Sequence, residues 1–82
     1  MSTQKVSIRQ IKAARALLGW SQDDLAARSG VSQPTIKRLE AQGGPMGGRA
    51  ETGEKIRRTL EKAGIEFSNG NSPGVRLKGK KG

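Results

Sequence analysis

The sequence contains no cysteine, no histidine and no tyrosine. Without cysteine the chain can form neither disulfide bonds nor thiolate metal sites. Without histidine or cysteine, nucleophilic catalysis by Ser–His or Cys–His pairs is excluded, and a metal would have to be held by oxygen ligands alone. An enzyme is therefore the least favoured class of protein, and we expect no catalytic residue, no metal and no cofactor.

Acidic residues are also scarce, with 7 Asp and Glu against 16 Lys and Arg and a net charge of +9. A strong positive balance favours a partner that is a polyanion, although a basic ribosomal protein or a merely soluble basic protein would share it. Apolar runs long enough for a membrane span or a signal-peptide core are lacking. We expect a cytoplasmic protein, associated with the nucleoid if bacterial. Eighty-two residues predict one small domain of modest stability.

Residues 20–42 carry the clearest local pattern, WSQDDLAARSGVSQPTIKRLEAQ. Ser21 followed by Asp24 is a capping-box spacing, and Gly30 provides the positive φ that ends a helix at low cost. Ser32 can cap a second helix, in whose first turn Pro34 is tolerated. Apolar pairs five residues apart bracket both caps, as in hydrophobic staples. The pattern predicts helices over about 22–29 and 33–42, joined by a tight turn as in a helix-turn-helix.

The second of these helices has two different faces. Ile36, Leu39 and Glu40 share one face at i, i+3 and i+4, so the opposite side carries amides, a hydroxyl and two cations but no acid. Such side chains hydrogen-bond base edges and phosphates in the major groove. The predicted base contacts are Gln33, Thr35, Lys37 and Arg38.

The stretch resembles the helix-turn-helix of the Cro/repressor (XRE-type, lambda-repressor-like) DNA-binding family. The matching positions, in chain order, are Ser21-Gln22, Leu25-Ala26, Gly30-Val31-Ser32-Gln33, Thr35-Ile36 and Leu39-Glu40. With the preceding and following helices the resemblance covers about two thirds of the chain. It implies a small helical bundle and a transcriptional regulator that binds double-stranded DNA, with the helix 33–42 in the major groove.

The resemblance also implies roles for residues outside the recognition helix. The glutamine matching Gln22 clamps backbone phosphate in the family. The full set of expected phosphate contacts is Gln22, Ser32, Arg49 and Lys78. A cation at the position of Arg15 pairs in the family with the acid that closes the recognition helix, here Glu40. The alternative is that Arg15 and Glu40 are two independent surface charges.

The rest of the chain predicts two more helices and a β-hairpin. Capping-box and staple spacings place a first helix at about 8–18. GGPMGG at 43–48 interrupts the helices, and a further helix follows at about 51–63, although Gly53 suggests a start only at Thr52. Alternation on either side of SNGNSPG predicts a hairpin over about 65–78. The expected organisation is a helix-turn-helix domain at 1–64, the hairpin, and a flexible basic tail at 79–82.

The hairpin has an apolar face that must cover the helices or meet another chain, because an isolated two-stranded hairpin is marginal in water. We favour a dimer contact, with covering of the monomer core as an alternative of comparable weight. The predicted dimer residues are Ile65, Phe67, Val75 and Leu77. A homodimer would bind an inverted repeat with half-sites about 34 Å apart.

Two other functions stay open at this point. The first is an antitoxin-type repressor that also binds a partner toxin. The second is a basic protein-interaction adaptor whose outer face meets an acidic protein or RNA. Sequence-dependent affinity for DNA discriminates the adaptor from a DNA-binding regulator, because general polyanion binders show little of it.

Overall fold

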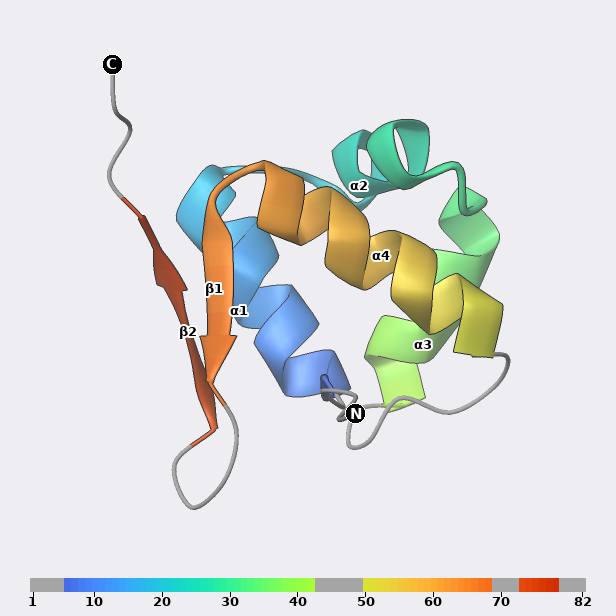
Figure 1. The fold of residues 1–82 in the computed structure, drawn as a ribbon. Helices are drawn as coiled ribbons and strands as arrows, with labels where there is room; N and C mark the ends of the chain where they lie inside the picture. The colour runs from blue at the N-terminus through green and yellow to red at the C-terminus, as the bar shows by residue number, and fades with distance from the viewer. Residues whose placement is uncertain (1–5, 43–49, 69–72, 79–82) are drawn as a thin grey trace.

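Four helices and a two-stranded antiparallel sheet follow one another along the chain (Figure 1). The computed structural model describes residues 6–42, 50–68 and 73–78. The elements are α1 (Ile8–Leu18), α2 (Gln22–Ser29), α3 (Gln33–Gln42), α4 (Ala50–Lys62), β1 (Ile65–Ser68) and β2 (Gly74–Leu77). The mainly α fold with a helix-turn-helix and a C-terminal hairpin confirms the predicted fold class.

Local sequence signals set both ends of α1. The hydroxyl of Ser7 accepts from the backbone N–H of Gln10 at 3.2 Å, and the Gln10 side-chain oxygen accepts from the Ser7 N–H at 2.8 Å. This reciprocal capping box begins the helix. Gly19 ends it with φ of 72°, a left-handed conformation that glycine adopts without a Cβ penalty.

The helix α4 begins earlier than Gly53 suggested. It includes Ala50, Thr52 and Gly53, so Thr52 is not its N-cap. Ile56 and Leu60 are both fully buried. Burial of these two side chains against the other helices outweighs the small helix penalty of one glycine, which is about 1 kcal/mol.

One hydrophobic core joins every helix to the first strand. The helices surround it on several sides in Figure 1. Its buried residues are Val6, Ile8, Ile11, Ala14, Leu25, Val31, Ile36, Leu39, Ile56, Leu60 and Ile65. The two helices of the helix-turn-helix therefore have a fixed support on their inner side, provided by α1 and α4.

The hairpin lies along α1, on the side away from α3 (Figure 1). Its register pairs Ile65 with Leu77 and Phe67 with Val75, which places these four apolar side chains on one face. Phe67 and Val75 pack against the helical core and Ile65 is part of it. The apolar face therefore covers this chain's own helices. None of the helices within the described segments is long and apolar enough to span a membrane.

Candidate nucleic-acid interface

The turn between α2 and α3 is fixed by short-range contacts. Ser21 and Asp24 form the expected capping box, with the Ser21 N–H donating to the Asp24 carboxylate at 2.9 Å and the Asp24 N–H to the Ser21 hydroxyl at 3.0 Å. These bonds lower the pKa of Asp24 below its usual value. Gly30 ends α2 with φ of 80°. Leu25 and Val31, on either side of the turn, are buried, so the angle between the helices is held by packing as well.

The helix α3 turns one face inward and leaves the other free. Ile36 and Leu39 are buried in the core. At the first turn the hydroxyl of Ser32 donates to the hydroxyl of Thr35 at 2.9 Å. This hydroxyl pair differs from the simple side-chain cap that the sequence suggested for Ser32, and it places two hydroxyl groups together at the beginning of α3.

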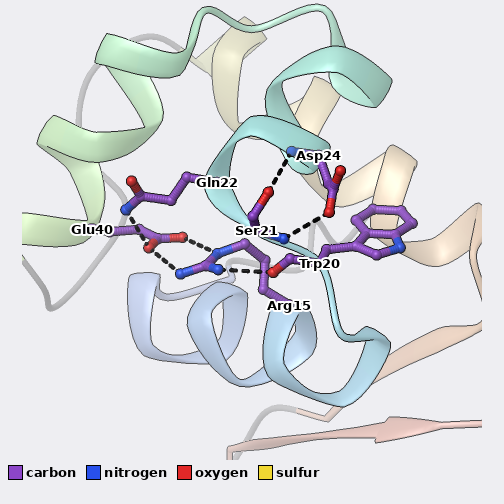
Figure 2. A network of polar contacts seen from close by, with 6 residues as sticks. All are labelled: Arg15, Trp20, Ser21, Gln22, Asp24 and Glu40. Carbon is purple, nitrogen blue, oxygen red and sulfur yellow. Dashed lines mark hydrogen bonds and ion pairs between the residues drawn. The ribbon is translucent and has the colours of Figure 1, made fainter.

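A partly buried ion pair connects α1 to α3 (Figure 2). Arg15 donates through Nε to one Glu40 oxygen at 2.8 Å and through Nη2 to the other at 2.6 Å. Its Nη1 donates to the backbone carbonyl of Trp20 at 2.9 Å. The Glu40 side chain is only 5% exposed. The structure thus brings together the two charges for which the resemblance implied a pair.

Both ionised forms are stabilised by this geometry. Burial raises the pKa of Glu40, but the hydrogen bonds from Arg15 and Gln22, with the positive charge of Arg15, outweigh it and lower the pKa overall. The hydrogen bond to Glu40 raises the pKa of Arg15. Two-point contact with a carboxylate also fixes orientation, so the pair sets the position of α3 relative to α1.

Gln22 belongs to the same network. Its Nε2 donates to a Glu40 oxygen at 3.0 Å, so the first residue of α2 is tied to α3 (Figure 2). The residue is only half-buried. The resemblance implied a role on phosphate for this side chain, and the structure shows what holds it in place at the start of α2.

The outward side of α3 carries the predicted base contacts. Lys37 and Arg38 are exposed, whereas Gln33 and Thr35 are partly exposed. Within the described ranges, neither cation on this face forms an ion pair. All four side chains come from two consecutive turns of one helix, so they can meet the same short segment of a groove.

Of the other two predicted phosphate contacts, Arg49 and Lys78, the structure describes only Lys78. Arg49, together with the glycine-rich break at 43–48, falls outside the described residues. Lys78 follows β2, on the far side of α1 from α3, and its ammonium approaches the Glu66 carboxylate at 3.9 Å. The structure therefore does not bring Lys78 to the surface formed by α2 and α3.

The predicted dimer residues divide into two groups. Ile65 is 2% exposed, so it is not available to a second chain and that part of the prediction was wrong. The sequence shows the alternation of the hairpin but not which surface its apolar face covers. Phe67 and Val75 are half-buried against the core. Leu77 is 40% exposed. Leu17, on α1, is 47% exposed, and no motif in the sequence indicated this.

The sequence motif indicated Gln10 only as a capping residue. In the structure its Nε2 also donates to the carbonyl oxygens of Ser68 and Gly74, at 2.9 and 3.0 Å. Gln10 is 5% exposed. The sequence does contain a signal for these contacts, since Gln10 is a polar residue beside the apolar stripe of α1. A buried amide needs hydrogen-bond partners, so a contact with another segment could have been expected.

This geometry is that of a helix-turn-helix protein. The second helix, α3, has a basic outward face without acidic residues. On its inner side, the partly buried ion pair of Arg15 and Glu40 holds it in place. Residues 11–46 match the model of the helix-turn-helix family. A search of curated proteins gives no significant match. This match supports a helix-turn-helix domain of the type found in Cro/repressor (XRE-type) DNA-binding regulators.

Proposed function

We propose that the chain recognises a specific operator by inserting α3 into the major groove. The observation that supports this most is the outward face of α3, where two exposed cations lie beside an amide and a hydroxyl and form no ion pair with any described acid. Base contacts specify a sequence, whereas phosphate contacts only position the protein. Binding would thus control transcription by occupying a promoter or by contact with polymerase. The protein would act in the cytoplasm, on the nucleoid.

The chemistry of each side chain suggests its target. The amide of Gln33 suits a bidentate contact with adenine, and the guanidinium of Arg38 suits O6 and N7 of guanine. Thr35 suits a thymine methyl group or a phosphate, and Lys37 a phosphate or a base. Pro34 offers apolar contact only.

Phosphate contacts would flank this face. We assign them to Gln22, whose amide is held by Glu40, to the Ser32 hydroxyl beside Thr35, and to Arg49. Lys78 is a weaker candidate, because it lies on the far side of α1 and already approaches Glu66.

A homodimer on an inverted repeat would double the number of bases contacted, with half-sites about 34 Å apart. The exposed leucines Leu17 and Leu77 are the apolar side chains of the described segments that such a contact would use, in place of Ile65. Substituting both by Gln should yield a monomer by light scattering. A dimer that survives this double substitution would place the contact elsewhere.

The test of the function is selection of bound duplexes from a random library at about 0.15 M salt, where non-specific binding is weakened. We expect a two-fold motif. Arg38→Ala should weaken binding to the selected duplex by about 1–3 kcal/mol and relax the preference at one base pair. The matched control is Arg9→Ala, which removes an exposed arginine of α1.

Enrichment of a motif that Arg38→Ala leaves unchanged would assign base recognition to other residues. Salt-sensitive binding with no enriched motif would contradict an operator-binding regulator. That outcome would favour the adaptor function, and the search would turn to a protein partner.

A further inference from the structure

An open cleft of about 450 Å³ lies between α2 and α4. Its volume falls in the range of small-molecule sites, which is about 300–1,000 Å³. Its walls combine the indole of the single tryptophan of the chain with four cations and no acid. These five residues are Trp20, Arg28, Lys55, Arg58 and Lys62.

Three basic side chains of α4 lie on one face of the helix and form one wall of the cleft. Lys55, Arg58 and Lys62 are spaced i, i+3 and i+7, so they share one face of the helix. The acids Glu54 and Glu61 are instead held by Arg57, at 2.7 and 2.8 Å.

Of the cations of the cleft, only Arg58 forms an ion pair within the described segments, at 3.2 Å to Glu54. Lys55 and Lys62 are exposed and form none there. Glu54 thus offsets part of the charge of Arg58, whereas the two lysines of the cleft have no ion-pair partner among the described residues.

The opposite wall of the cleft contains an arginine stacked on the tryptophan ring. The guanidinium of Arg28 lies over the Trp20 ring, 4.6 Å from its centroid. Stacking on an indole holds the planar guanidinium while leaving its N–H groups free to donate. Asp24 of α2 accepts from the Ser21 N–H in the capping box, and its charge also interacts with that of Arg28 without a direct ion pair among the described residues.

The cleft is separate from the recognition surface. No residue of α3 lines it. In Figure 2 the Trp20 ring points away from Gln22 and Glu40. Cations in the cleft are therefore not needed for the contacts assigned to α3, and their function requires a different explanation.

We propose that this cleft binds a small molecule through a diphosphate or triphosphate group. Four cations within one small cleft match the charge of such a group, and arginine and lysine are the side chains that hydrogen-bond phosphate oxygens. The source is either free inorganic polyphosphate or the phosphate chain of a nucleotide. The proposal does not depend on the DNA-binding function.

The test uses the intact chain and the emission of Trp20 as the reporter. Sodium triphosphate and ATP are titrated separately at about 0.15 M salt, with sodium sulfate at matched ionic strength as the reference. We expect a saturable change with triphosphate and none with sulfate. Equal affinities for triphosphate and ATP would identify the phosphates as the whole ligand, and tighter binding of ATP would identify a nucleotide.

Matched variants separate a site from general attraction by a chain of charge +9. Lys62→Gln should raise the Kd for triphosphate about tenfold, the effect of one lost charge-assisted hydrogen bond. Lys12→Gln makes the same change at an exposed position of α1 and should leave the Kd unchanged. Unfolding midpoints in urea verify that both variants fold.

Three results would overturn the proposal. The first is no saturable change with either phosphate compound. The second is equal weakening in the Lys62 and Lys12 variants, which would show non-specific attraction. The third is loss of duplex DNA binding by Lys62→Gln with no binding of triphosphate, which would make the cleft a surface for the DNA backbone.

Discussion

The helix α1 holds two different regions of the molecule by two polar side chains, the partly buried Arg15 and the buried Gln10. Arg15 holds the helix-turn-helix, through Glu40 and the carbonyl of Trp20. Gln10 holds the hairpin, through the carbonyls of Ser68 and Gly74. Both contacts join segments far apart in the chain, but the first is ionic and the second is neutral.

Because one contact is ionic and the other neutral, the two regions should depend to different degrees on their anchors, Arg15 and Gln10. Removing one partner of a buried ion pair leaves an uncompensated charge, which costs more than the pair itself contributes. Removing a neutral amide leaves carbonyl groups that lose a partner, at a smaller cost. The recognition helix therefore depends on its anchor more than the hairpin depends on its own.

The largest effect is expected from Arg15→Ala. It leaves the Glu40 carboxylate buried with only the hydrogen bond from Gln22. We expect the free energy of unfolding to fall by about 3 kcal/mol, measured by urea denaturation. Arg9→Ala, an exposed arginine on the same helix, is the control. An Arg15 variant that melts within a degree or two of the wild type would show that the pair does not support the fold.

The ionic anchor should also depend on pH. The folded pKa of Glu40 is lowered, so its contribution is fully present above the ordinary value of 4.5 and is lost as pH falls through the lower, folded pKa. The difference in unfolding free energy between the wild type and Glu40→Gln should therefore shrink from pH 6 to pH 3. A difference independent of pH would mean that Glu40 contributes by packing and not by charge.

A smaller effect is expected from Gln10→Ala. The change removes two donors to the hairpin and one half of the α1 capping box. We expect a loss of about 1–2 kcal/mol. Amide exchange should become faster in the hairpin, for example at the Lys78 N–H, which donates to the Gly64 carbonyl at 2.8 Å.

Gln10→Glu tests the same hydrogen bonds between α1 and the hairpin. It keeps an acceptor for the Ser7 N–H but places a carboxylate against two carbonyl oxygens, so the hairpin should again be loosened at neutral pH. If the hairpin amides of both variants stay as protected as in the wild type, packing of Phe67 and Val75 alone anchors the hairpin.

The smallest effect is expected at the ion pair on the outer face of the hairpin. Glu66 is paired across the strands with Arg76, and the Arg76 side chain is 74% exposed. Water solvates both groups in the unfolded and the folded chain, so exposed pairs contribute little. Glu66→Ala should leave the urea midpoint at about neutral pH unchanged. A loss as large as that of Arg15→Ala would reverse the ranking of buried and exposed pairs.

Elements of the fold that depend on neighbouring residues could be predicted from the sequence. The helix caps are such elements, because each depends on residues only a few positions apart in the sequence. They are the capping boxes of Ser7 and Ser21 and the glycines at 19 and 30. The face of α3 follows from helical geometry alone. The partner of Arg15 is 25 residues away, and only the resemblance to a family, not the spacing, indicated it.

The ends of α1 and α2, the polar side of α3 and the excess of positive charge follow from the order of residues alone. The start of α4, the burial of Ile65 within its own chain, the reach of Gln10 to residues 58 and 64 positions away, and the basic cleft between α2 and α4 depend on the tertiary structure. The physical reason is that caps and helical faces arise from short-range bonds, whereas these contacts exist only once distant segments pack together.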